Sequence, residues 1–139
     1  MNRRLALSLA FAAALLAQTT RSVWDGVYTA DQAKRGQELY AKECASCHGS
    51  DLTGGESAPA LAGPGFLSSW TTLTVGQLFE RTRVTMPDNN PGKLSRAQVA
   101  DLIAYLLSAN RFPAGKAELD KQAEVLNQIR IDAEAPKKR

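Results

Sequence analysis

The sequence predicts an all-α domain of three to four helices joined by long loops. Two stretches, Thr29–Gln32 and Ser95–Gln98, match a helix-start signature. In this capping box a Thr or Ser side chain and a Gln three residues later each bond the other's free backbone N–H. No stretch of useful length alternates apolar and polar residues as a half-buried strand does. The chain is 44% hydrophobic, which favours one folded domain over disorder.

The first helix is expected from about residue 30 to 42, ending just before Cys44. Gly36 lies inside this helix, with Tyr40 one turn further on. A glycine in a helix interior costs about 1 kcal/mol relative to alanine. We therefore expect another backbone to cross closely at Gly36, with Tyr105 filling the gap beside it.

Two further helices follow a long connection. Residues 49–74 are rich in Gly, Ser, Thr and Pro, which predicts an irregular segment. A short helix is expected from about Val75 to Arg83, with Leu78 and Phe79 in the core. After Ser95, apolar residues recur at helical spacing and predict the last main helix: Val99, Leu102, Ile103, Leu106 and Leu107. An irregular segment of this length suits a compact domain when it wraps a ligand.

The chemistry is concentrated in Cys44-Ala45-Ser46-Cys47-His48, which holds both cysteines and the only histidine of the chain. Cys-x-x-Cys-His is typical of a c-type haem attachment site. Two thiols at this spacing on a helical turn can each bond one haem vinyl group, and the next imidazole can then bind the iron. We predict one covalent haem c, attached at Cys44 and Cys47, with His48 as a ligand.

Three other interpretations of the motif are a structural disulfide, a thioredoxin-like redox pair and a zinc site. A thioredoxin-like pair belongs to a βαβ unit, and the sequence contains no such pattern. Zinc prefers four ligands, and these residues provide three. Of these interpretations, we predict haem attachment.

Met86 is the candidate for the second axial ligand. It is the only methionine apart from the initiator, and it precedes the turn-rich run Pro87–Gly92. A second histidine is not available, so the alternatives are a lysine, a water molecule or an open site. The structural alternative is that Met86 fills the core, which is the ordinary role of a lone methionine.

The first twenty residues predict a signal peptide. Arg3 and Arg4 precede the run Leu5–Ala17, which is apolar except for one serine. This run has 13 residues, whereas a membrane-spanning helix needs about 20, so we expect cleavage and not an anchor. Cleavage would leave 15 Lys and Arg against 14 Asp and Glu. A nearly neutral chain gives no electrostatic support for nucleic-acid binding.

These features resemble the small monohaem cytochrome c family over about residues 30 to 110. The resemblance implies the cytochrome c fold, in which helices and long loops wrap one haem. The segment Pro59–Gly63 resembles the family's Gly-Pro-x-Leu-x-Gly segment, although Ala58 replaces the first glycine. By this match the Pro59 carbonyl accepts a hydrogen bond from His48 Nδ1, and Leu61 packs on the haem face. Trp70 is expected either to hold a haem propionate or to fill a structural role. Arg81 and Arg83 are expected to be solvated, with pairing to haem propionates as the alternative.

The expected organisation is a signal peptide (1–20), a cytochrome c domain (21–110) and a C-terminal extension (111–139). The extension should be a strap or short helix with a frayed basic tail. A docking element for a partner is the alternative.

The predicted function is single-electron transfer in the periplasm by a monomer that is not an enzyme. The expected partners are a redox donor and an acceptor such as a terminal oxidase. The extension resembles segments of cytochrome domains that serve quinoprotein dehydrogenases, which makes such a dehydrogenase a candidate donor. The alternatives are a bound subunit of a dehydrogenase complex, or an open-site haem protein that binds a small ligand or peroxide. We expect the haem-free chain to be largely unfolded.

Overall fold

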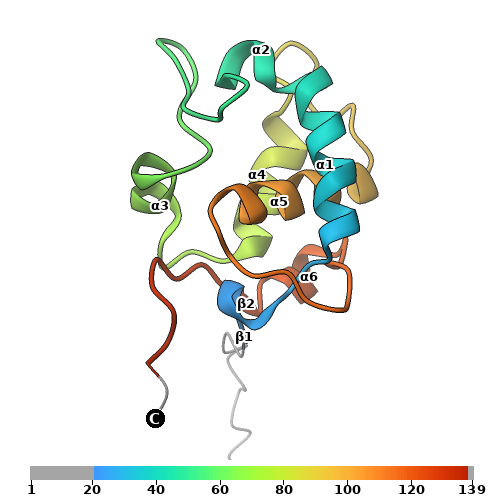
Figure 1. The fold of residues 1–139 in the computed structure, drawn as a ribbon. Helices are drawn as coiled ribbons and strands as arrows, with labels where there is room; N and C mark the ends of the chain where they lie inside the picture. The colour runs from blue at the N-terminus through green and yellow to red at the C-terminus, as the bar shows by residue number, and fades with distance from the viewer. Residues whose placement is uncertain (1–20, 138–139) are drawn as a thin grey trace, which may run out of the picture.

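The computed structural model describes residues 21–137, and within them the architecture is mostly helical (Figure 1). The helices are α1 (Ala30–Glu43), α2 (Ala45–His48), α3 (Pro64–Trp70), α4 (Val75–Thr85), α5 (Arg96–Ala109) and α6 (Ala123–Leu126). A 3-10 turn (Val23–Asp25) and two short strands, β1 (Arg21–Ser22) and β2 (Ile129–Arg130), complete the set. The all-α prediction is confirmed. The predicted signal peptide and the last two residues lie outside the described residues.

The helix starts agree with the sequence except in one detail. Ser95 and Thr74 each form a complete capping box with the Gln three residues later. At Thr29 only half of the predicted box exists. The Thr29 side chain accepts from Gln32 N–H, but the Gln32 side chain does not bond the Thr29 N–H. The Gln32 side chain is instead buried, where its amide donates to Leu119 O at 3.1 Å and accepts from Leu119 N–H at 2.7 Å. A tertiary partner that satisfies both ends of the amide has displaced the local cap.

Helices α1 and α5 cross at Gly36, as its position inside the helix predicted. A Cβ atom at Gly36 would lie 1.8 Å from the carbonyl oxygen of Asp101 and 2.9 Å from the Cβ of Tyr105. Glycine is therefore required for this crossing, with the Asp101 backbone as the nearest neighbour. Tyr40 and Tyr105 then meet one turn further along, with their ring centroids 5.3 Å apart.

Helix α3 and the pair of strands β1 and β2 were not predicted. Helix α3 interrupts the segment 49–74, and it begins with Pro64 at its first turn, a position that suits proline. Strands β1 and β2 pair in parallel, with Arg21 opposite Ile129 and Ser22 opposite Arg130. This pair joins two segments that lie more than a hundred residues apart in the sequence. Strands of two residues are too short to produce a periodicity that would predict them.

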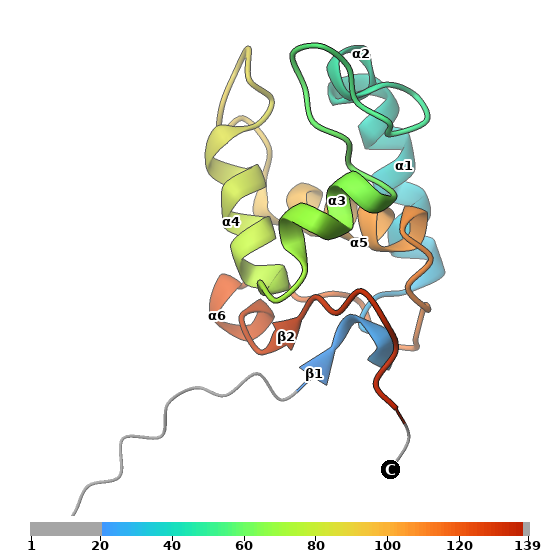
Figure 2. The same cartoon turned by 90° about the vertical axis from the view of Figure 1, so that its left-hand side faces the viewer.

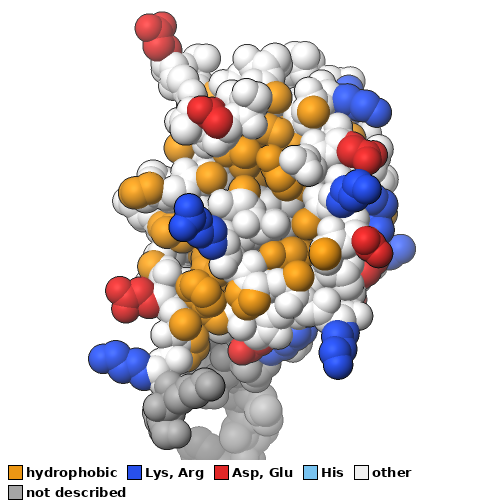
Figure 3. Space-filling model, in the orientation of Figure 1, with side chains coloured by type: hydrophobic (Ala, Val, Ile, Leu, Met, Phe, Trp, Pro, Cys, Tyr) orange, Lys and Arg blue, Asp and Glu red, His pale blue; other side chains and the backbone are white. Residues whose placement is uncertain are grey.

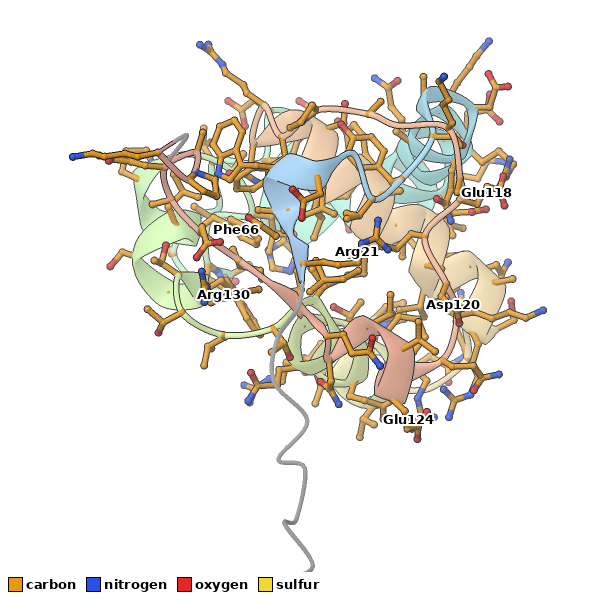
Figure 4. The ribbon with its side chains drawn as sticks, turned by 90° about the horizontal axis from the view of Figure 1, so that it is seen from below. Arg21, Phe66, Glu118, Asp120, Glu124 and Arg130 are labelled. Atoms are coloured by element: carbon orange, nitrogen blue, oxygen red, sulfur yellow. The ribbon has the colours of Figure 1, made fainter. Side chains whose placement is uncertain are left out.

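The segment 112–132, here called the strap, packs against the lower end of the molecule. Six of its apolar side chains join the core and are buried: Phe112, Leu119, Ala123, Leu126, Ile129 and Ile131. The strap also bonds the turn between α3 and α4, because Ile131 N–H donates to Leu73 O and Thr72 N–H donates to Ile131 O. Figure 4 views this end from below, with Arg21 and Arg130 at the strand pair and Glu118, Asp120 and Glu124 along the outer side of the strap.

The opposite end is built from loops. Figure 2 shows the loop after α2 and the loop after α4 extending to the same end of the molecule, with α3 crossing below them. We call residues 44–63 and 86–94 the motif end. Among residues 21–137, no helix has the length and apolar character needed to cross a membrane.

Candidate functional site

The attachment motif forms its own short helix directly after α1. Cys44 ends α1 and begins α2, with a backbone conformation outside the helical region that turns the chain between the two. Both thiols are free; Cys44 is half-buried and Cys47 is exposed. Burial, followed by the nearby Glu43 and Cys47, raises the pKa of the Cys44 thiol to about 11. Redox-active Cys-x-x-Cys pairs have lowered thiol pKa values, so this environment disfavours the thioredoxin-like interpretation.

His48 is buried and has one fixed polar partner. Its Nδ1 lies 2.8 Å from the carbonyl oxygen of Pro59, the contact that the family resemblance implied. A carbonyl oxygen can only accept, so Nδ1 carries the proton and donates it, while Nε2 keeps its lone pair. An imidazole held in this tautomer is suited to bind a metal through Nε2.

The loop that carries Pro59 reaches His48 because of a glycine that the sequence analysis did not single out. Gly54 has φ +77°, and its N–H donates to His48 O at 2.8 Å. A Cβ atom at Gly54 would lie 2.6 Å from Ala58 O and 2.7 Å from Ala60 N. The hairpin-like return of the chain to Pro59 therefore requires glycine here.

Tyr40 anchors the other side of the motif. Its hydroxyl donates to Gly49 O at 2.7 Å, which ties the residue after His48 back to α1. Burial raises the pKa of Tyr40 to about 12, so the hydroxyl remains a donor at all physiological pH values. The imidazole is thus placed between two backbone contacts, one on each side of the motif.

Met86 begins the second loop of the motif end. It ends α4, where its N–H donates to Thr82 O at 3.0 Å, and its side chain is half-buried. The far end of this loop is tied to the motif by an ion pair of 2.7 Å between Lys93 Nζ and Glu43. The fold therefore brings the Met86 loop and the attachment motif to the same end of the molecule (Figure 2).

The remaining predicted site residues lie around α3. Leu61 and Trp70 are half-buried and pack against the core, and the Trp70 ring lies 6.4 Å from that of Phe66. Phe66 is fully buried and was missed by the sequence analysis, since it lies in the segment expected to be irregular. Arg81 is exposed as expected, but Arg83 is not merely solvated, because it pairs with Glu80 at 2.7 Å.

The donor set and its surroundings fit a haem c. Two free thiols, one imidazole with an available Nε2 and a thioether are the groups that covalent haem attachment and His/Met ligation use. Hydrophobic side chains occupy the middle of the face shown in Figure 3, between charged side chains along the α1 edge and near the C-terminus. The chain has no charged residue from Ser57 to Phe79, so the segment that carries Pro59, Leu61 and α3 brings no charged side chain to this part of the molecule.

A helical fold with this motif at the end of its first helix defines the class of c-type cytochromes. The family model described as cytochrome c oxidase, cbb3-type, subunit III matches residues 31–106. The chain therefore belongs to this family of monohaem c-type cytochrome domains. Membership makes it a haem-binding protein of electron transport.

A solved structure has a similar fold. The crystal structure of the sulfane dehydrogenase SoxCD from Paracoccus pantotrophus matches with a TM-score of 0.50 and 23% identity. The match covers 77% of this chain and 61% of that chain, so this chain spans less than two thirds of its length. At this identity the likeness concerns the fold. No curated protein sequence matches the chain significantly.

Proposed function

We propose that the chain is a periplasmic carrier of single electrons that holds one haem c through Cys44 and Cys47, with His48 and Met86 as axial ligands. The observation that carries this proposal is the His48–Pro59 hydrogen bond, which fixes the imidazole with Nε2 available beside two free thiols. The iron of a bound haem c would take up and release one electron, passing between Fe(III) and Fe(II).

Each protein group has a distinct role in this proposal. Cys44 and Cys47 form the thioether bonds and fix the orientation of the group. His48 donates from Nε2, and its Nδ1–H bond to Pro59 increases the basicity of the ring. Met86 supplies a thioether, which favours Fe(II), so we expect a positive midpoint potential.

In this proposal, apolar side chains would keep water away from the ligands. Leu61 and the buried Phe66 provide apolar surface, and Trp70 lies at the end of α3 where its indole can face a propionate. If His48 and Met86 both held the iron, its coordination would not need to change on electron transfer, so little rearrangement would oppose the transfer. We assign the haem-binding role to residues 21–110 and treat 111–139 as an extension that supports them.

A dehydrogenase is the donor that we propose. The fold match to a sulfane dehydrogenase and the resemblance of the extension to quinoprotein-associated cytochromes support this class. The acceptor in the proposal is a terminal oxidase, in line with the family description. Residues 1–20 would direct export and be removed.

The test is potentiometry on protein matured with a cytochrome c assembly system. We expect a reversible titration that fits one electron per chain with a positive midpoint potential. A strongly negative midpoint, or rapid binding of carbon monoxide to the reduced protein, would contradict ligation by Met86. A protein without visible absorbance would contradict haem attachment itself.

A further inference from the structure

Asn110, the residue at which α5 ends, holds the loop that carries the hydrogen-bond acceptor of His48. Its Nδ2 donates to Leu106 O at 2.8 Å and to Leu61 O at 3.0 Å, and its Oδ1 accepts from Gly63 N–H at 3.0 Å. Because carbonyl oxygens only accept and a backbone N–H only donates, a single orientation of the amide satisfies all three bonds. The side chain is therefore fixed in one direction.

These contacts clamp the segment 59–63 from one side. On its other side, Leu61 N–H donates to Leu52 O at 2.8 Å, a bond between two parts of the same loop. Asn110 thus provides the link from this loop to the rigid helix α5. Gly63 is also the residue that precedes α3, so the same amide fixes where α3 begins.

We propose that Asn110 is a positioning residue, which sets the strength of the His48–Pro59 hydrogen bond and through it the midpoint potential of the bound haem. The inference rests on the proposed function. A firm acceptor at Nδ1–H makes the imidazole a stronger donor to iron, which stabilises Fe(III). When the loop is released, the bond to Pro59 weakens and Fe(II) gains relative stability.

The test compares the haem-loaded variants Asn110→Ala and Asn127→Ala. Asn127 is a matched control, because it also ends a helix and its Oδ1 also accepts a hydrogen bond, here from the Thr74 hydroxyl at 2.9 Å. We expect Asn110→Ala to shift the Fe(III)/Fe(II) equilibrium up to about tenfold toward Fe(II). For one electron a tenfold shift is about 59 mV, seen as a rise in midpoint potential. Asn127→Ala should leave the potential unchanged.

A second readout separates this role from a general loss of stability. In the reduced protein, the proton NMR signal of His48 Nδ1–H should exchange with water faster in Asn110→Ala than in wild type. Asn110→Ser, which keeps one hydroxyl for the loop, should fall between the two in both measurements. If Asn110→Ala does not retain haem, Asn110→Ser takes its place in the comparison with wild type.

The inference is overturned if Asn110→Ala, or Asn110→Ser in its place, keeps the wild-type potential and exchange rate with an intact haem spectrum. It is also overturned if Asn127→Ala shifts the potential equally. Failure of the proposed function is a separate result, since it appears in wild type as a spectrum without haem or without methionine ligation.

Discussion

The strap end and the motif end of the molecule are each stabilised by different kinds of contact. At the strap end, apolar side chains are fully buried, among them Leu126 and Ile131, and backbone bonds join segments from both ends of the chain. At the motif end, Cys47 and Pro59 are exposed, Leu61 and Met86 are half-buried, and polar contacts from Tyr40, Lys93 and Asn110 hold the loops.

Under the proposed function, this difference assigns the dependence on haem to the motif end. Burial of apolar surface is the main favourable contribution to folding, and the strap end obtains it from protein atoms alone. The loops of the motif end bury fewer apolar side chains of their own, so under the proposed function the haem faces supply the surface against which they pack. Substitutions at the strap end should therefore lower stability without changing the haem, whereas loss of the haem at the motif end should also lower stability.

The largest effect is expected when the attachment thiols are removed. The double variant Cys44→Ser, Cys47→Ser should contain no covalent haem, measured as haem that stays with the protein after extraction in acidified acetone. Because the motif end then lacks its apolar partner, far-UV circular dichroism should show most of the helix content lost. Retention of covalent haem, or an unchanged dichroism spectrum without haem, would contradict the comparison. The variant Ser46→Ala, between the two cysteines, serves as the control.

A large effect on stability alone is expected at the strap end. Leu126→Ala removes a fully buried side chain and should lower the free energy of unfolding of the holoprotein by about 2–5 kcal/mol. Its neighbour Val125 is 43% exposed, so Val125→Ala should change the free energy of unfolding by no more than about 0.5 kcal/mol. Denaturant titration measures both. A shift in the visible spectrum of Leu126→Ala would show that the two ends are not separable in this way.

A smaller loss is expected where the strap meets α1. Gln32→Leu keeps the approximate volume of the side chain but leaves the N–H and carbonyl of Leu119 without their partner. An unsatisfied buried polar group costs about 1–3 kcal/mol, and the free energy of unfolding should fall by a similar amount. Gln37→Leu, at an exposed position on the same helix, provides the comparison. Equal stability of the two variants would show that the buried amide contributes nothing.

The smallest effect is expected at the exposed ion pairs of Arg35 with Asp101 and Glu118. Hydrogen bonds to Asp101 and then to Glu118 raise the pKa of the Arg35 guanidinium, so it is charged at every accessible pH. Arg35→Met should lower the melting temperature slightly at low salt, and the difference from wild type should shrink in 1 M salt, where charges are screened within about 3 Å. A difference that persists in high salt would instead point to lost packing of the arginine stem.

The sequence predicted the parts of the fold that depend on local patterns. The attachment motif, the three main helices and the close crossing at Gly36 are all visible in spacing and residue type. Helix α3 was missed because Gly, Ser and Pro dominate its surroundings, although a proline after Gly63 is a recognised helix-start signal.

The parts that could not be predicted depend on contacts between distant residues. Gln32 bonds Leu119 instead of capping its own helix, Asn110 reaches back to Leu61, and β1 pairs with β2. None of these partners can be chosen from one sequence, since many polar residues compete for each. The role of Gly54 could have been predicted from the sequence, because it lies beside a segment that must approach His48, where a side chain would obstruct the backbone.

The most direct test of ligation by His48 and Met86 is the visible spectrum of the oxidised and reduced holoprotein, recorded for wild type and for Met86→Leu. We expect a sharp reduced α band in both proteins. We expect the weak long-wavelength charge-transfer band of Fe(III)–methionine ligation in wild type only. If wild type lacks this band, or if Met86→Leu keeps it, Met86 is not the ligand and the proposal of a His/Met electron carrier is wrong.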